Sequence, residues 1–338
     1  MTLENSLFGR LDDPAGEAGH VDHPPRVGFF TDTSVCIGCK ACEVACKEWN
    51  LIPDDGFNLL GMSYDNTGML GANTWRHVAF VEQEVPAGRR TPPFADTPTG
   101  ASGIEAASDA AATALREAPS RGAGGAEPVD LGMPKFELPG ARTGAESRQE
   151  FRWLMASDVC KHCTHAACLD VCPTGALFRT EFGTVVVQQD ICNGCGYCVS
   201  ACPYGVIERR EDDGRAWKCT MCYDRLHDGL EPACAKACPT DSIQFGVLDE
   251  LRERAQERVT QLHDAGVTEA RLYGEDPDDG VGGDGAFFLL LDEPEVYGLP
   301  PDPVVTTRDL PRMWRYAGAA ALAFFGAGVS VFVEGRRR

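Results

Sequence analysis

The residues of this chain that could do chemistry are its 16 cysteines, which fall into four groups of four with none left over. A thiolate is a ligand for metal ions, so cysteines that recur at short, regular spacing indicate metal sites. The first and third groups have the spacing C-x2-C-x2-C-x3-C, the second has C-x2-C-x4-C-x3-C, and the fourth has a long gap at its centre. In sequence order the groups are Cys36, Cys39, Cys42 and Cys46; Cys160, Cys163, Cys168 and Cys172; Cys192, Cys195, Cys198 and Cys202; and Cys219, Cys222, Cys234 and Cys238.

The spacing indicates which kind of metal site these groups form. Three cysteines separated by two residues can wrap three corners of a cubane, while the fourth follows one helical turn later, about 6 Å along the helix. That displacement carries the fourth cysteine to a neighbouring cluster, as in bacterial ferredoxins. Proline follows the last cysteine of three groups, at Pro173, Pro203 and Pro239, where it fixes the exit of the chain. The pattern therefore predicts four [4Fe–4S] clusters.

Other cysteine chemistries match the pattern less well. Zinc ribbons use two C-x2-C pairs and have no need of a third cysteine at the same spacing. Structural disulfides show no such clustering, and thioredoxin-type chemistry needs a single C-x2-C pair. A zinc-dependent interaction protein is the remaining alternative, and iron and acid-labile sulfide analysis would distinguish it.

Charge and length limit the possible partners and domain count. The chain has 31 basic and 51 acidic side chains, a net charge of −20, which argues against nucleic acid as a partner. Its 338 residues suffice for about two domains or for one domain with insertions. By the exchange of the fourth cysteine, the second and third groups pair with each other, and the first and fourth pair around them. We expect an α+β fold of two nested bacterial-type two-[4Fe–4S] ferredoxin modules.

The chain divides into segments by composition and by these groups. We expect an N-terminal extension without a signal peptide, two interleaved modules, an insertion rich in alanine, glycine and proline, and a C-terminal region ending in a membrane helix. The segments are 1–25, the extension; 26–84, the first half of the first module; 85–150, the insertion; 151–212, the second module; 213–247, the second half of the first module; 248–311, a helix and strand segment; 312–334, the transmembrane helix; and 335–338, a basic tail.

Hydrophobic patterning predicts a few regular elements outside the cysteine loops. Strands are expected at 26–31, 74–83, 183–189 and 287–291, and an amphipathic helix at 248–263. The insertion is predicted to be mostly irregular, with a short helix near 104–116.

The C-terminal segment 316–333 has no charged residue over 18 positions, about 27 Å as a helix against roughly 30 Å of hydrocarbon. Arginines lie on both sides of it, and Trp314 and Tyr316 suit a membrane interface. These features predict a single transmembrane helix in the lipid bilayer, with a buried soluble helix as the alternative. No histidine follows His263, so a haem at this membrane would have to belong mainly to a partner.

Lysine is rare in this chain, with six residues against 25 arginines, yet five of the six lie in or beside the cysteine groups. A cubane with four thiolates is an anion, and reduction makes it more negative. Ammonium groups nearby would stabilise the reduced state. The five are Lys40, Lys47, Lys161, Lys218 and Lys236.

Longer stretches resemble a known family. They are CIGCKACEVACKEWN (36–50), CNGCGYC (192–198), KCTMCYDR (218–225), EPACAKACPTDSIQFG (231–246), DGVGG (279–283) and VYGLPPDP (296–303). The sequence from about residue 26 to 333 resembles the iron–sulfur (beta) subunit of membrane-bound respiratory formate dehydrogenase. This is one of the four-cluster ferredoxin-type electron-transfer subunits of molybdopterin oxidoreductases. The insertion looks longer than the equivalent connection in that family.

The resemblance implies a non-catalytic electron-transfer subunit. Its partners would be a formate dehydrogenase catalytic subunit carrying molybdenum or tungsten bis(pterin), and a membrane cytochrome b that passes electrons to quinone. The module of the first and fourth groups would lie nearer the catalytic subunit. A hydrogenase or a sulfur-compound reductase with identical clusters is the alternative complex. We expect the protein in the cell membrane, crossing it once, with the cluster domain on the extracytoplasmic side.

Carrying the cysteine exchange through all four groups gives the expected ligands. Cluster 1 takes Cys36, Cys39, Cys42 and Cys238; cluster 2 takes Cys46, Cys219, Cys222 and Cys234; cluster 3 takes Cys160, Cys163, Cys168 and Cys202; and cluster 4 takes Cys172, Cys192, Cys195 and Cys198.

Overall fold

A computed structural model describes residues 11–56, 64–65, 67–84, 151–305, 307 and 310–337. The chain divides into two compact units, residues 1–83 with 153–338 and residues 84–152. The expected irregular insertion at 85–150, with its helix near 104–116, lies outside the described residues.

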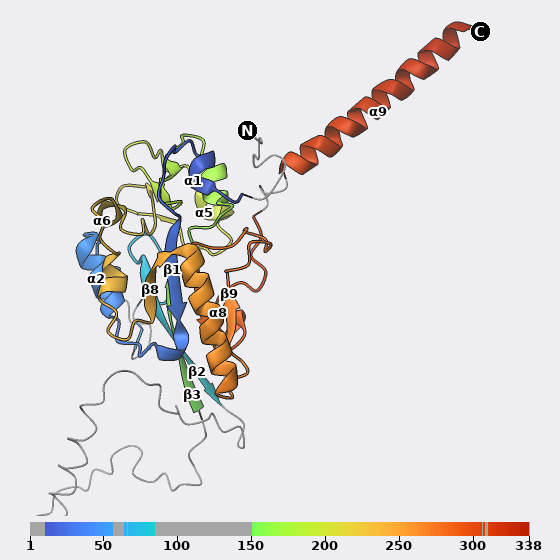
Figure 1. Ribbon diagram of the computed structural model, residues 1–338. Helices are drawn as coiled ribbons and strands as arrows, with labels where there is room; N and C mark the ends of the chain where they lie inside the picture. Colours follow the sequence, from blue (N-terminus) through green and yellow to red (C-terminus); the bar gives the residue numbers. More distant parts are fainter. Residues whose placement is uncertain are drawn as a thin grey trace, which may run out of the picture. The chain divides into compact units, whose positions relative to one another are not determined.

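A four-stranded mixed sheet forms the centre of the first unit (Figure 1). The strand order is β8 (Ile243–Val247), β1 (Val27–Asp32), β10 (Ala286–Leu290) and β9 (Arg271–Tyr273). β1 runs parallel to β10, whereas β8 and β9 are antiparallel to their neighbours. The strands predicted at 26–31 and 287–291 are confirmed as β1 and β10. Segments more than 250 positions apart in the sequence thus share one ladder.

Successive side chains of β1 serve different layers because residues alternate across a strand. Phe30 packs with the helix α8 (Leu248–Asp264), which confirms the helix predicted at 248–263. Phe29 points to the other layer, where it packs with cysteines of the first and fourth groups. The sheet therefore separates a layer made by α8 from a layer that holds cysteines.

Three two-stranded ladders surround the cysteine loops. β2 (Arg76–Glu84) pairs with β3 (Phe151–Val159), β4 (Leu177–Arg179) with β5 (Val185–Val187), and β6 (Glu208–Arg209) with β7 (Ala216–Trp217). The strands predicted at 74–83 and 183–189 are confirmed as β2 and β5.

Short helices carry or border the cysteines. They are α2 (Ala41–Trp49), α4 (Ala167–Asp170), α5 (Tyr197–Ala201), α6 (Tyr223–His227) and α7 (Ala233–Lys236). The remaining short elements are α1 (Pro14–Glu17) and the 3₁₀ turns η1 (Thr33–Val35) and η2 (Pro294–Tyr297).

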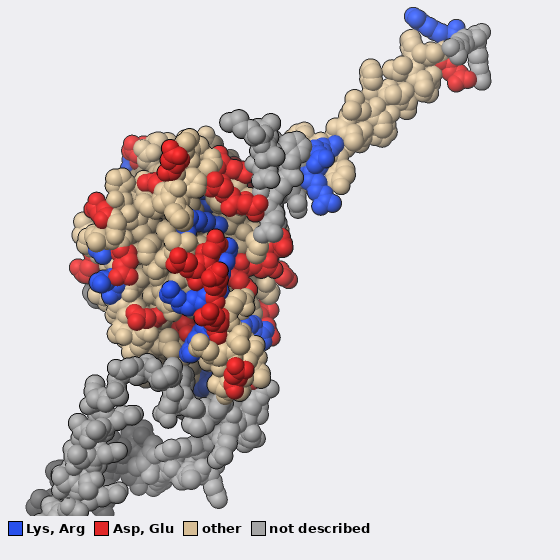
Figure 2. Space-filling view, in the orientation of Figure 1, with Lys and Arg blue, Asp and Glu red and all other residues tan. Residues whose placement is uncertain are grey.

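The C-terminal helix α9 (Leu310–Arg337) is long and apolar enough to cross a membrane. Its candidate span, Arg312–Arg336, contains an 18-residue window with a mean hydropathy of 1.8, and none of that window is buried. Figure 2 shows a middle part without charged side chains and arginines toward both ends. The mixed α and β content and this candidate membrane helix agree with the expected fold class.

Candidate iron–sulfur sites

Three hollows in the described residues are each lined by four cysteines. The members of a fourth quartet are identified by their electrostatic effect on the pKa of Cys198. The hollows hold about 290, 240 and 370 Å³ of empty space, counted out to open solvent. In the fourth quartet, burial and the nearby Cys192, Cys195 and Cys172 raise the pKa of Cys198 to about 11. Site 1 comprises Cys36, Cys39, Cys42 and Cys238; site 2, Cys46, Cys219, Cys222 and Cys234; site 3, Cys160, Cys163, Cys168 and Cys202; and site 4, Cys172, Cys192, Cys195 and Cys198.

These quartets combine the same cysteines as the expected ligand sets, and their role as iron ligands stays a prediction. The cysteines of sites 1, 2 and 3 each surround a hollow. Within the described ranges, no three His, Cys, Asp or Glu side chains form a group that could hold a single metal ion.

In both modules, two short helices each contribute cysteines to two neighbouring sites. On α2, Cys42 lines site 1 and Cys46, four residues later, lines site 2. On α7, Cys234 lines site 2, while Cys238 just beyond the helix lines site 1. Because α2 packs against α7, each helix contributes to both sites.

The second module repeats this arrangement with α4 and α5, which also pack together. Cys168 on α4 lines site 3, and Cys172 follows the helix into site 4. Cys198 on α5 belongs to site 4, and Cys202 follows into site 3. One turn of helix thus sets the step from one site to the next, at about 6 Å of rise.

The two C-x2-C-x2-C loops share a left-handed backbone pattern. Gly38 and Lys40 have φ of 64° and 59°, and Gly194 and Gly196 have φ of 71° and 77°. A side chain at Gly38 would approach the ring of Phe80 to 2.6 Å, so this turn needs glycine for space as well as for conformation. These turns bend the loops of sites 1 and 4 around their cysteines before α2 or α5 begins.

The four sites differ in their exposure to solvent. Every cysteine of site 2 is buried, and site 3 contains no exposed cysteine. Sites 1 and 4 each contain one exposed cysteine, Cys39 and Cys195. Sites 2 and 3 are called the inner sites below, and sites 1 and 4 the outer sites.

Burial raises the pKa of the thiols that line these hollows. The pKa rises to about 11 for Cys42 and to about 12 for Cys168, with burial as the largest cause. Such thiols would stay protonated at neutral pH on their own, whereas metal ligands must be thiolates. A bound cationic metal core removes that conflict, because it replaces the proton.

A fully buried guanidinium lies against site 2. Arg76, the first residue of β2, is 1% exposed and donates from Nη2 to Cys234 Sγ at 3.4 Å. Its Nη1 donates to the Ser157 carbonyl at 3.0 Å, and the guanidinium lies 4.9 Å from the centre of the Phe29 ring. Burial opposes this charge, but the sulfurs of Cys234 and Cys42 outweigh burial and raise the pKa of Arg76.

A fully buried ammonium lies between sites 2 and 3. Lys218, which follows β7, is 2% exposed, and its Nζ donates to Cys160 Sγ at 3.5 Å and to the Cys219 carbonyl at 2.9 Å. It also donates to the Val185 carbonyl. Burial would lower the pKa of Lys218, but the sulfurs of Cys160, Cys168 and Cys219 raise it.

These two cations test whether the residues fit an iron–sulfur cluster. A buried charge beside neutral thiols is costly, and it is stabilised when the neighbouring group is an anion. A cubane ligated by four thiolates is such an anion. Arg76 and Lys218 are therefore placed as counter-charges, and the quartets fit the cluster that their spacing predicts.

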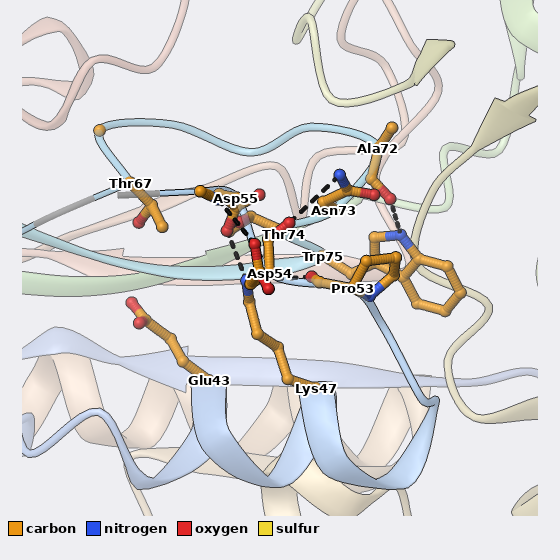
Figure 3. Close-up of polar contacts among 12 residues, drawn as sticks. Glu43, Lys47, Pro53, Asp54, Asp55, Thr67, Ala72, Asn73, Thr74 and Trp75 are labelled. Atoms are coloured by element: carbon orange, nitrogen blue, oxygen red, sulfur yellow. Dashed lines mark hydrogen bonds and ion pairs between the residues drawn. The ribbon is translucent and has the colours of Figure 1, made fainter. Parts of the chain in front are cut away.

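Of the five lysines that were expected to stabilise reduced clusters, one is positioned to do so. Among the five lysines, all within the described ranges, only Lys218 has an ammonium that contacts a cysteine sulfur. The other four pair with carboxylates: Lys40 with Glu43 and Asp65, Lys47 with Asp55 (Figure 3), Lys161 with Asp158, and Lys236 with Glu231.

Sequence reasoning missed Arg76, Asn50 and Ser157. Asn50 Nδ2 lies 3.8 Å from Cys46 Sγ and 3.7 Å from Cys222 Sγ, and Ser157 Oγ lies 3.2 Å from Cys42 Sγ. Asn50 could have been found, since it ends the stretch CIGCKACEVACKEWN. Arg76 and Ser157 lie in β2 and β3, far along the sequence from any cysteine they serve.

Two family models match the chain, both described as a 4Fe-4S dicluster domain, over residues 35–176 and 151–248. The formate dehydrogenase nitrate-inducible iron-sulfur subunit of Escherichia coli (strain K12) is 33% identical over 85% of this chain and 76% of its own length. The formate dehydrogenase-O iron-sulfur subunit of the same organism is 32% identical over 92% of this chain and 84% of its own. The B subunit of that organism's anaerobic dimethyl sulfoxide reductase is 31% identical over 68% and 77%. With its four cysteine quartets and this similarity, the protein belongs to the family of the formate dehydrogenase iron–sulfur subunits.

Proposed function

We propose that this protein is the non-catalytic electron-transfer subunit of a formate dehydrogenase complex. The observation that carries this proposal is the set of four cysteine quartets, three of which line hollows and two of which are flanked by buried cations. When bound, [4Fe–4S] clusters accept and release single electrons. The cysteines of sites 1 to 4 would hold one cluster each, so the protein would contain about sixteen iron atoms.

The protein's own residues support an arrangement of the four sites in series. Sites 1 and 2 share α2 and α7, and sites 3 and 4 share α4 and α5. Sites 2 and 3 meet at Lys218, which contacts Cys160 of site 3 and the carbonyl of Cys219 of site 2. The order is therefore site 1, site 2, site 3, site 4, with an exposed cysteine at either end.

The attachment of the segment before α9 supports a direction along this series. Thr307 donates to the carboxylate of Asp170 at 2.5 Å, and Val305 packs against Ala167. Asp170 and Ala167 belong to α4, the helix between sites 3 and 4. The polypeptide thus leaves for α9 from the second module, so we assign site 4 to the membrane side.

Site 1 is then the end that faces the catalytic subunit, in agreement with the family resemblance. That partner would carry molybdenum or tungsten bis(pterin). A membrane cytochrome b would receive electrons at the site 4 end. The loop of site 1 exposes Ile37 beside Cys39, and Tyr197 is exposed beside the site 4 loop, so both ends offer apolar contacts to a partner.

Reduction by substrate tests the proposal. The complex is purified anaerobically from membranes, its large subunit is identified, and formate is added while the visible absorbance of the clusters is recorded. We expect formate to bleach the clusters without another reductant. Similarity to a dimethyl sulfoxide reductase subunit supports the alternative complex. If dithionite-reduced clusters are reoxidised by a sulfoxide while formate has no effect, the alternative is correct.

We place α9 across the cell membrane, with the cluster domain on the extracytoplasmic side. Arginines flank both ends of α9 at similar net charge, so the positive-inside rule barely discriminates. Export of the folded subunit with a partner that bears a twin-arginine signal favours the outside. Protease added to intact spheroplasts should cleave the cluster domain. Protection in spheroplasts, with cleavage only after lysis, would place the domain in the cytoplasm.

A further inference from the structure

The inner sites present an electrostatic problem that the outer sites do not. Accepting an electron adds one negative charge to a site, and removal from water disfavours that charge. The outer sites are open to water at Cys39 and Cys195, whereas every cysteine of site 2 is buried. Without compensation, the inner sites would be harder to reduce than their neighbours, and a series of sites would be interrupted at its centre.

We propose that Arg76 and Lys218 are positioning residues that raise the reduction potentials of the inner sites and so keep electron transfer continuous between sites 1 and 4. This inference rests on the proposed function, because it requires that the quartets hold clusters. It concerns fixed charge only: one electron enters a site, no proton is taken up, and no bond forms or breaks.

The position of Lys218 serves both inner sites. Its Nζ lies 3.5 Å from the sulfur of Cys160 in site 3, and it also binds the carbonyl of Cys219, a site 2 residue. Two backbone carbonyls, those of Cys219 and Val185, hold the ammonium without neutralising it. No carboxylate forms an ion pair with Lys218 among the described residues. Its full positive charge is thus directed at sulfur.

Arg76 places a second buried positive charge beside site 2. Its Nη2 contacts Cys234 at 3.4 Å, and its Nη1 is held by the Ser157 carbonyl. The Phe29 ring covers the guanidinium at 4.9 Å from the ring centre, which keeps water from the charge. Site 2, the most buried of the four, is therefore the site whose residues contact both buried cations.

Lys161 provides a matched control within the same structure. It is fully buried, it follows the ligand-type residue Cys160, and it lines the site 3 hollow. Its ammonium, however, is paired with Asp158 and lies over the rings of Phe288 and Tyr204, at 4.9 and 5.1 Å from their centres. Its ammonium is hydrogen-bonded to Asp158 and to the Val159 carbonyl, not to a cysteine sulfur, so its loss should shift the sites' potentials less than the loss of Lys218 does.

The test is an anaerobic redox titration of the full-length protein in its complex, followed by EPR, for the native protein and for Lys218→Met, Arg76→Met and Lys161→Met. Iron per protein molecule is measured on each sample. We expect Lys218→Met to lower the midpoints of sites 3 and 2, and Arg76→Met to lower the midpoint of site 2 most. At a fixed potential the ratio of reduced to oxidised site should fall about tenfold, or ~59 mV for a one-electron couple.

The inference is overturned if Lys218→Met and Arg76→Met, with full iron content, titrate as Lys161→Met does. It is also overturned if the outer sites shift more than the inner ones. Conservative variants keep the test decisive should the methionine variants lose iron. Lys218→Arg and Arg76→Lys retain a charge, so they should retain iron and near-native midpoints. Loss of iron or lowered midpoints in these variants as well would show that packing, not charge, is required.

Failure of the proposed function would look different. A native protein without iron and acid-labile sulfide would refute the clusters themselves, before any variant is compared. A native protein with about sixteen iron atoms and unresponsive midpoints would refute only the role of Arg76 and Lys218.

Discussion

Site 2 and site 4 each receive a cysteine from a helix of the other group, but they have different surroundings. Site 2 is lined by Phe29, Trp75 and Arg76, and all of its cysteines are buried. Site 4 opens to solvent at Cys195, and the Cys192 sulfur accepts from a neutral donor, the Ala216 N–H at 3.4 Å. The cysteine spacing is thus enough to exchange cysteines between neighbouring sites. The local charge and the exclusion of water depend on residues outside the motif.

The comparison extends to the inner and outer sites as classes. An outer site is reached by water and by partners through its exposed cysteine. An inner site has no exposed cysteine, and a buried cation lies beside it where the outer sites have water. Three further experiments would break or sharpen this contrast.

Replacing Cys238 should have the largest effect, because it removes a ligand of an outer site from a group whose other cysteines serve an inner one. Cys238 lines the site 1 hollow with Cys36, Cys39 and Cys42. We expect Cys238→Ser to disrupt site 1, with a loss of up to about four iron atoms per protein molecule, and to spare site 2. EPR signals should match those of Cys36→Ser.

The matched control is Cys222→Ser, in the same sequence group but at site 2. It should remove a different set of signals from Cys238→Ser. If both variants lose the same signals while those assigned through Cys36→Ser persist, the exchange of ligands is wrong and the comparison of sites 1 and 2 fails with it.

Exposure to air or to an iron chelator should have a moderate effect that separates the two classes. Oxidants and chelators reach the outer sites through Cys39 and Cys195, whereas no cysteine of the inner sites is exposed and those of site 2 are all buried. We expect about half of the iron to leave in a fast phase and the rest in a slow one. EPR during the decay should show sites 1 and 4 lost first. A single phase, or earlier loss of site 2, would contradict the importance of burial.

Much of the local fold was predictable from the sequence. The strand β1, the buried strand β10 and the helix α8 follow from alternating and helical patterns of apolar residues. The parallel pairing of β1 with β10 was not predictable, because it joins Phe29 to Ala286 and no local signal links such distant segments. The interleaving of the modules was inferred only because the cysteine spacing carries long-range information.

The sites show the same division between local and distant information. The quartets follow from a spacing of three residues and one helical turn. Arg76 could not be identified in this way, since it is 158 residues from Cys234 and sits in a strand whose sequence has no metal-binding pattern. The lysines show the converse error: Lys40, Lys47, Lys161 and Lys236 are close to cysteines in sequence, but their ammonium groups pair with carboxylates.

Lys47 provides the last test and the smallest expected effect. It is the residue after Cys46 of site 2, so its position in the sequence is as close to a cysteine as that of Lys218. Figure 3 shows its side chain directed toward Asp55, which also accepts from Thr74 Oγ1 at 2.6 Å. Both charged groups are about a quarter exposed, at 28% and 24%, so the pair contributes less than about 1 kcal/mol.

We therefore expect Lys47→Met to lower the thermal midpoint of the iron-loaded protein by no more than about 4 °C. Asp55 keeps its bond from Thr74, so the loop after α2 stays attached. The midpoint potential of site 2 should change little, because water screens this partly exposed pair and the ammonium is not hydrogen-bonded to a sulfur. A fall in that potential as large as the one in Lys218→Met would show that charge near a cysteine in sequence acts on the site regardless of its partner. The contrast between balanced and unbalanced lysines would then have no electrostatic basis.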